Sequence, residues 1–314
     1  MTNVLGIIFA NSHEECIPEL SANRTMASIP FGGRFRLIDF HLSNMVNSGM
    51  TRVGVITKSN YQSLIDHIGS ARQWDLARTD GGLTILPPYG RTDSGLYTGK
   101  LEAIRGALGY ITKSPCEYVA ITDCNMVYNA DFLKLTEAHI ESGADITCAA
   151  VNAEFTASET ADSIIFNAGG NGRVKETIIN CARAGNYKMS LNVFLLKKQL
   201  LIDLVTDLIP KGKLNFARDI LQDMADELDI RVYDYEGYYS KISDLESYYD
   251  ANMALLDKSN LERLILMKRP IYTKVRDDAP SKYGLNSSVT NSLVADGCII
   301  EGVVENSILF RGVR

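Results

Sequence analysis

The chain has 314 residues, enough for one large domain or two, and its 46% hydrophobic and 22% charged residues are ordinary for a globular protein. Its formal net charge of −6, without a cluster of Lys or Arg, argues against a nucleic-acid partner. No apolar run approaches the length of a membrane span, and the N-terminus lacks the charged start of a secretion signal. We therefore expect a cytoplasmic protein that does not contact a membrane.

The cysteine pattern predicts neither a disulfide framework nor a zinc site. The cysteines are scattered and form no Cys-x-x-Cys pair. Several stand in apolar or strand-like runs, so we expect reduced thiols that pack as small core residues. The six are Cys16, Cys116, Cys124, Cys148, Cys181 and Cys298.

Hydrophobic patterning predicts an α/β fold from the first residues onward. Apolar, β-branched runs predict buried strands at 4–10, 51–57 and 116–122. Helical spacing predicts helices at 35–49, 60–74 and 131–143, the last with a capping Asp131 and a terminal Gly143. Alternating strands and helices indicate a mostly parallel, doubly wound sheet.

Ligands of such sheets bind beyond the carboxyl ends of the strands. The loop Phe9–Pro18, FANSHEECIP, and the segment after Thr122 are therefore the expected site loops. The first of them is unusual for a phosphate-binding loop, because it has no glycine, no Lys or Arg, and two adjacent glutamates.

A six-residue repeat follows near the end of the chain. Val294 and Ile300 are six positions apart, and Cys298 and Val304 each follow four positions later. This spacing is typical of a parallel β-helix, although an ordinary pair of strands gives a similar sequence. We divide the chain into a domain at 1–260 and a connector with the start of a β-helix at 261–314. The repeat stops before enough coils exist to cap a solenoid, which predicts either a truncation or a partner that covers the end.

The segment SIPFGGRFRLIDFHLSNMVNSGMTRVGVIT at 28–57 closely resembles the glucose-1-phosphate adenylyltransferases, or ADP-glucose pyrophosphorylases. YYDANMALL at 248–256 and SLVADGCIIEGVVENSILFRGV at 292–313 match the same family in order. The resemblance implies a Rossmann-like nucleotidyltransferase domain followed by a left-handed β-helix, in a tetrameric enzyme of glycogen or starch synthesis. Members use magnesium and join glucose 1-phosphate to ATP, releasing pyrophosphate.

Compared with this family, the loop after the first strand has lost its phosphate-binding residues. The family loop is G-G-x-G-x-R, with a Lys-Pro further on. The corresponding positions here are Asn11, Ser12, His13, Glu14, Glu15 and Cys16, with Met26 at the lysine. Without glycines the backbone cannot approach phosphates as closely, and two carboxylates repel a triphosphate. If Glu14 and Glu15 instead face solvent, the loop still lacks donors.

The family's two metal-binding aspartates are only half preserved. Asp123 matches the first and is the one retained catalytic candidate, whereas Lys241 stands at the second. Magnesium requires hard anionic oxygen ligands, so an ammonium there removes a ligand and adds the wrong charge. We favour a salt bridge between Lys241 and Asp123 in an empty site, because recruiting Asp244 or Glu246 would need a register shift. We predict no bound metal.

The sugar and nucleotide sides depart from the family as well. Glu-Lys-Pro has no clear counterpart, and Ser-Met-Gly becomes KMS at 188–190. Gly-Thr-Ala-Asp-Ala becomes GKLEA at 99–103. Phe-Gly-Lys-Asp survives loosely as FARD at 216–219, in which Arg218 is a candidate phosphate contact. So many departures together are hard to reconcile with efficient turnover.

The segment PFGGRFRLIDF at 30–40, by contrast, is nearly intact. Gly32 and Gly33 suit a tight turn. Arg34 and Arg36 are candidates for binding an anionic effector and, with equal weight, for pairing within the fold.

A chain that keeps its fold and loses its catalytic groups is typical of a regulatory partner. Our leading hypothesis is a non-catalytic or weakly catalytic subunit that forms a hetero-oligomer, expected to be a tetramer, with a catalytic paralogue. The first alternative is an active glucose-1-phosphate adenylyltransferase that works through Asp123 with magnesium. The second is a free-standing sensor of a small molecule. The pocket's ligand would be a small effector or a sugar phosphate, and the leading hypothesis requires no cofactor.

Overall fold

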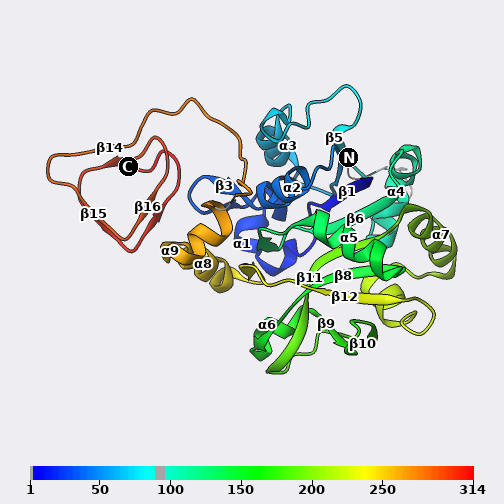
Figure 1. The fold of residues 1–314 in the computed structure, drawn as a ribbon. Coiled ribbons are helices and arrows are strands. Elements are labelled where there is room, and N and C mark those ends of the chain that lie inside the picture. Colours follow the sequence, from blue (N-terminus) through cyan, green and yellow to red (C-terminus); the bar gives the residue numbers. More distant parts are fainter. Residues whose placement is uncertain (1–2, 89–95, 267) are drawn as a thin grey trace.

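Four parallel strands form the centre of the fold in the computed structural model, which describes residues 3–88, 96–266 and 268–314 (Figure 1). In spatial order they are β5 (Gly82–Leu86), β4 (Arg52–Ile56), β1 (Val4–Phe9) and β6 (Tyr118–Asp123). Every residue of β1 is buried, as a strand covered on both faces requires. The strands predicted at 4–10, 51–57 and 116–122 are confirmed, with ends shifted by at most two residues.

Beyond β6 the sheet becomes mixed. β11 (Gly185–Lys197) runs antiparallel to β6 and also pairs with β8 (Ile146–Phe155) and β9 (Ile164–Ala168). β10 (Val174–Ile179) and β12 (Ile230–Asp234) complete a sheet of nine strands within the described residues. The parallel sheet is thus confirmed for its first half. The second half is mixed, because β11 is antiparallel to its neighbours whereas β12 runs parallel to β8.

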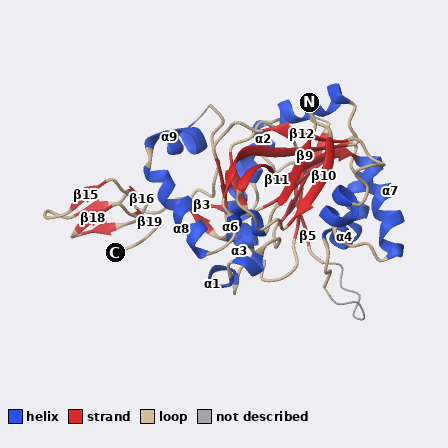
Figure 2. Ribbon diagram, turned by 90° about the horizontal axis from the view of Figure 1, so that it is seen from below, coloured by secondary structure: helices blue, strands red, loops and turns tan. Residues whose placement is uncertain are grey.

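Helices cover both faces of the sheet. α4 (Lys100–Lys113) and α7 (Lys198–Leu208) pack together on one face (Figure 2). α2 (Leu37–Asn47), α3 (Gln62–Ile68) and α5 (Phe132–Ser142) lie on the other. A hydrophobic core lies on each face of the sheet, and alternate residues of β1 pack into one or the other. Leu5 and Ile7 point toward α4, and Val4 and Ile8 point toward α2. This alternation follows from the two-residue period of a strand.

The predicted helices are confirmed with corrected limits. α5 begins after Asp131, whose side chain accepts from the N–H of Leu133, and ends at a left-handed Gly143, as expected. The helix predicted at 35–49 begins only at Leu37, because β3 (Phe35–Arg36) forms a hairpin with β2 (Pro30–Phe31). The helix predicted at 60–74 is shorter, since α3 stops before Gly69 and a separate 3-10 turn follows at 72–74.

A tight turn joins β2 to β3, as predicted. Gly32 and Gly33 both have left-handed backbone angles, with φ of +57° and +81°. A Cβ on Gly32 would also lie 3.0 Å from the Leu255 side chain. Any other residue would therefore be strained at this turn.

The three segments that match the family pattern meet at this hairpin. α8 (Leu245–Met253) contributes Tyr248, whose hydroxyl donates to the Pro30 carbonyl at 2.7 Å, and Asn252, whose Oδ1 accepts from the Gly32 N–H at 2.9 Å. The last of the segments also arrives here, because a Cβ on Gly33 would lie 3.5 Å from the Leu309 carbonyl. These residues therefore join distant parts of the chain.

The C-terminal residues form short parallel strand pairs. β14 (Lys282–Tyr283), β15 (Ser288–Thr290) and β16 (Leu293–Val294) outline three sides of a coil in Figure 1. They pair in turn with β17 (Ile299–Ile300), β18 (Val303–Glu305) and β19 (Ile308–Leu309). Parallel strands stacked in this way are compatible with the predicted β-helix, which stays a prediction. α9 (Lys258–Leu261) precedes the connector.

The cysteines, all six within the described residues, are free thiols. Four are buried, but Cys16 and Cys181 are partly exposed, so the expectation that the cysteines pack in the core is wrong for these two. No helix among the described residues is both long and apolar enough to cross a bilayer.

His41 on α2 supplies a test of the core. It is fully buried, its ring packs edge-on against Tyr128, and its Nδ1 lies 3.2 Å from Thr122 Oγ1. Burial lowers its pKa to about 4, against a smaller opposing effect of the Asp123 charge. Because the unfolded chain takes up a proton near pH 6.5 that the folded chain excludes, stability is lost as the pH falls through this window.

We expect His41→Asn to reduce this acid sensitivity. Between about pH 7 and about pH 5, the free energy of unfolding should fall by about 2 kcal/mol less in the variant than in the wild type. Urea denaturation at the two pH values measures it. An equal fall in both proteins would show that His41 is already charged in the folded state.

Candidate functional site

The carboxyl ends of β1 and β6 bring the two predicted site loops together. Phe9 is in register with Asp123, the last residue of β6. The loop after β1 leads through Ser12 and His13 into the 3-10 turn η1 (Glu14–Cys16), and His13 Nε2 lies 3.2 Å from Asp123 Oδ2. A cleft of about 320 Å³ opens here, walled by Phe194 and Phe216 and by hydroxyl and amide side chains.

Asp123 is buried, with 1% of its side chain exposed, and it is held by a lysine. Lys100 Nζ donates to Asp123 Oδ2 at 2.7 Å. Lys100 is the first residue of α4, and Gly99 allows this position, since a Cβ on Gly99 would lie 2.2 Å from the Leu214 carbonyl oxygen. Burial alone would raise the pKa of Asp123, but the Lys100 ammonium and the His13 hydrogen bond together hold it well below its usual range.

His13 bridges two carboxylates. Its Nε2 faces Asp123, and its Nδ1 lies 2.9 Å from Asp162 Oδ2. Burial would lower the pKa of His13, but the hydrogen bonds to Asp123, Asp162 and Cys16 outweigh it and raise that pKa well above 6.5. The hydrogen bond from His13 in turn lowers the pKa of Asp162 to about 2. The imidazole is therefore a cation between two anions at neutral pH.

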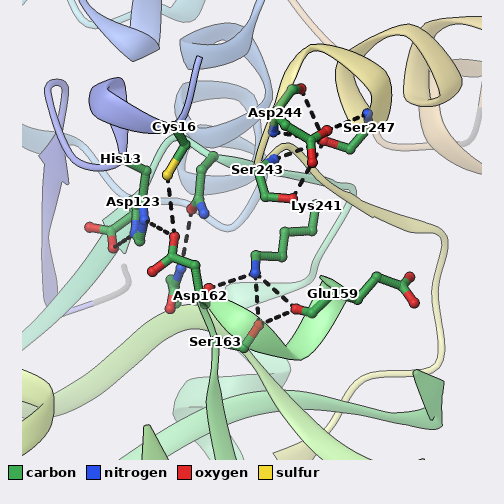
Figure 3. A network of polar contacts seen from close by, with 12 residues as sticks. His13, Cys16, Asp123, Glu159, Asp162, Ser163, Lys241, Ser243, Asp244 and Ser247 are labelled. Atoms are coloured by element: carbon green, nitrogen blue, oxygen red, sulfur yellow. Dashed lines mark hydrogen bonds and ion pairs between the residues drawn. The ribbon is translucent and has the colours of Figure 1, made fainter. Parts of the chain in front are cut away.

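Cys16 and Asp162 extend this network toward α6 (Ala157–Ala161), as Figure 3 shows. Cys16 Sγ donates to Asp162 Oδ2 at 3.5 Å. Asp162 follows α6 directly, and a capping box of Thr156 and Glu159 fixes the start of that short helix. The two residues are 146 positions apart in the chain, so only the fold brings them together.

Lys241 does not make the predicted salt bridge with Asp123. It ends β13 (Tyr239–Lys241), which pairs with β7 (Met126–Tyr128), and its Nζ donates to the carbonyls of Glu159 and Asp162 and to Ser163 Oγ (Figure 3). The predicted salt bridge is wrong because carbonyl groups at the end of α6 accept from the Lys241 ammonium. The Asp123 carboxylate is already paired with Lys100. Burial lowers the pKa of Lys241, against the opposing charge of Asp162.

The remaining residues of the loop have structural roles or face solvent. Asn11 is buried and ties the loop to the end of β4, accepting from the Lys58 N–H at 2.7 Å. Glu14 accepts from Asn11 Nδ2 at 2.7 Å, and Glu15 is exposed. Met26 is fully buried in the core. The two glutamates thus divide between an internal hydrogen bond and solvent.

Known proteins resemble this chain over nearly its full length. The family described as nucleotidyl transferase matches residues 16–258. The glycogen biosynthesis protein GlgD of Bacillus subtilis (strain 168) is 34% identical over 99% of this chain and 80% of its own length. The GlgD of Geobacillus stearothermophilus is 36% identical over 99% and 80% of the two chains. The glucose-1-phosphate adenylyltransferase of Geobacillus stearothermophilus is 32% identical over 99% and 81%. The chain belongs to the ADP-glucose pyrophosphorylase family.

Magnesium, which the ADP-glucose pyrophosphorylase family implies, does not fit the residues present. Asp123 Oδ2 already accepts from Lys100 and lies beside the His13 imidazolium, so the carboxylate charge is neutralised inside the protein. The second ligand position holds the Lys241 ammonium, and Asp244 caps α8 through the Ser247 N–H at 2.7 Å. A hard divalent cation would meet one neutralised carboxylate instead of two free ones.

The other family positions are occupied by internal contacts. Lys188 forms an ion pair with Asp234, Glu102 accepts from the Thr98 N–H, and Arg36 donates to the carbonyl and hydroxyl of Ser63. Arg36 therefore pairs within the fold, which is the second of the two roles expected for it. Arg218 lies beside Asp219 with 64% of its side chain exposed, outside the residues that line the cleft. Arg34 is exposed, and its guanidinium stacks on the Phe35 ring.

Sequence reasoning missed Asp162 and the role of Lys100. Lys100 was visible only as a departure from the family pattern, and no motif marks Asp162, because its partners come from the loop after β1. The signal for Lys100 is a lysine in a segment where the family pattern has neutral residues, combined with the loss of a metal-binding aspartate elsewhere.

We expect Lys100→Met to destabilise the protein by about 3 kcal/mol, because it leaves a buried carboxylate with one of its two cationic partners. Asp123→Asn in the same background should recover much of the loss, since no unpaired charge then remains. Urea denaturation gives the free energies of unfolding. Lys211→Met is the matched control, because it removes an exposed ion pair with Asp207 and should cost under about 0.5 kcal/mol. Equal losses for the two lysine variants would contradict a stabilising Lys100–Asp123 pair.

Proposed function

We propose that this chain is a regulatory subunit, non-catalytic or only weakly catalytic, of ADP-glucose pyrophosphorylase in glycogen biosynthesis. The observation that carries the proposal is the state of Asp123, whose charge Lys100 and His13 already balance at 2.7 Å and 3.2 Å. Catalysis by a metal would need this carboxylate to hold a cation that neutralises charge as pyrophosphate leaves. Here the Lys100 ammonium and the His13 imidazolium occupy the place of that metal ion. Because both belong to the protein, neither can leave with pyrophosphate as a metal ion can.

The relatives support the biological setting. Two of those described above are named glycogen biosynthesis proteins, and one is named an adenylyltransferase. Geobacillus stearothermophilus has one relative of each kind. We infer that this chain works beside a catalytic paralogue, in a cytoplasmic hetero-oligomer that is a tetramer.

The coil of β14 to β19 is, in this proposal, the start of a left-handed parallel β-helix, and 261–314 forms a unit separate from 1–260. Its parallel strand pairs and the buried Cys298 and Ile300 support this division. An anionic effector would meet the exposed Arg34, whereas Arg36 is engaged with Ser63.

One observation favours the active enzyme as the alternative. Asp123 Oδ1 is buried and has no hydrogen-bond partner among the described residues. A buried carboxylate oxygen without a partner is costly unless something binds it. In the active alternative this oxygen would hold the magnesium ion.

An assay of the purified chain alone, with ATP, glucose 1-phosphate and magnesium, distinguishes the regulatory subunit from the active enzyme. We expect ADP-glucose formation at least about a hundredfold below the 10 per second that is ordinary for enzymes. Turnover within that hundredfold, abolished by Asp123→Ala, would establish the active enzyme and overturn the proposal.

A second arm adds a catalytic paralogue at equal concentration. We expect a mixed oligomer by light scattering and a changed rate or effector response of the paralogue. If no mixed oligomer forms and the paralogue's rate and effector response stay unchanged, the chain is not a regulatory subunit of that paralogue. This conclusion holds whatever activity the chain has alone.

A further inference from the structure

We propose that His13, Cys16 and Asp162 form a binding site for zinc or a similar late first-row divalent cation. Among the described residues these three side chains are a cluster of nitrogen, sulfur and oxygen donors in which all donor atoms lie within 4.8 Å of one another. The inference does not depend on whether the subunit is regulatory or catalytic.

The donor distances are close to those of a tetrahedral metal site. His13 Nδ1 and Asp162 Oδ2 are 2.9 Å apart, and Cys16 Sγ and Asp162 Oδ2 are 3.5 Å apart. Zinc bonds of about 2.0–2.1 Å to nitrogen and oxygen and about 2.3 Å to sulfur place tetrahedral donors roughly 3.3–3.6 Å apart. The two distances to Asp162 Oδ2 are therefore within about 0.5 Å of those in a zinc site, and the three donor atoms all lie within 4.8 Å of one another.

A local turn prearranges two of the ligands. His13 has a left-handed backbone, with φ of +63°, which is uncommon outside glycine, and the Cys16 N–H donates to the His13 carbonyl at 3.2 Å. The His-x-x-Cys spacing across this turn resembles the short ligand pairs of zinc sites. The sequence predicted no zinc site, because the third ligand comes from a residue 146 positions away.

The surroundings orient the histidine as metal sites do. Ligating histidines commonly direct their second ring nitrogen to a carboxylate, which fixes the ring and strengthens the ligand. His13 Nε2 faces Asp123 Oδ2 at 3.2 Å, and Lys100 anchors that carboxylate from the other side. Nδ1 then faces Asp162 and the thiol.

The carboxylate of Asp162 is not paired with a lysine of the described residues, and a metal ion could replace the protons of its two partners. Lys241 donates to the Asp162 carbonyl, not to its carboxylate, and within the described part of the chain the carboxylate contacts His13 and Cys16. Binding would replace the proton shared at Nδ1 and the thiol proton, both released to solvent, and form bonds to Nδ1, Sγ and Oδ2. The thiolate selects zinc over magnesium.

The fourth position would face the cleft, because His13 and Asp162 line it. Three protein ligands with one open position leave a place for water or a small ligand. The ion would also tie the loop after β1 to the end of α6. Zinc binding would thus set the shape of the cleft beside the degenerate phosphate loop.

The test is titration of the metal-free, reduced full chain with Co²⁺ and then with Zn²⁺. We expect one equivalent of Co²⁺ to give a thiolate-to-cobalt absorption band with intense visible bands of a tetrahedral ion, both removed by Zn²⁺. Cys16→Ser should abolish the thiolate band and weaken Zn²⁺ binding at least about a hundredfold. Cys181→Ser is the matched control, since Cys181 is also partly exposed but lies outside the cluster.

Asp123→Asn tests the arrangement without removing a ligand and should weaken Zn²⁺ binding about 10–100-fold while the thiolate band persists. Circular dichroism of each metal-free variant separates loss of binding from loss of folding. Tetrahedral Co²⁺ bands that survive in Cys16→Ser, or no binding to a folded wild-type chain at about 100 times its concentration of Zn²⁺, would overturn the proposal.

Discussion

A carboxylate buried at the end of β6 must be balanced by positive charge, and the identity of that charge governs the rest of the site. Asp123 is out of solvent, so leaving it ionised and unpaired would cost several kcal/mol. The family resemblance implies that an active enzyme balances this carboxylate with a metal ion that also serves the reaction. Here Lys100 and His13 supply the balance from within the protein.

The substitutions in the site therefore depend on one another. The family resemblance implies a metal-binding aspartate where Lys241 stands, and without a metal Asp123 would need positive charge from another source. Lys100 on α4 and His13 in the loop after β1 supply the missing charge from two other elements. Lys241 itself is satisfied elsewhere, at the carbonyls that end α6. Each charged group of this network thus has a partner, although Asp123 Oδ1 accepts no hydrogen bond from the described residues.

The sequence predicted well what depends on local pattern. Strand β1, helix α5 with its two caps, and the Gly32–Gly33 turn follow from hydrophobic period, capping and backbone preference. The expected site loops also border a cleft at the carboxyl ends of β1 and β6, and its role as a binding site stays a prediction. Charge partners were not predictable in the same way. Lys241 and Lys100 are both lysines near Asp123, and only the packing of α4 against Leu214 and the position of α6 decide which of them reaches it.

The parts of the chain that keep the family pattern hold the fold together at a place distinct from the site. The hairpin of β2 and β3, helix α8 and the C-terminal coil meet through Tyr248, Asn252 and the backbone near Leu309. Because none of these contacts involves Asp123, His13 or Lys100, the junction can be maintained while the site changes. The junction and the candidate site are therefore physically separate, and residues of one can change without disturbing the contacts of the other. At the site itself, the buried charge of Asp123 is balanced by Lys100 and His13, so its stability does not rest on the contacts of the junction.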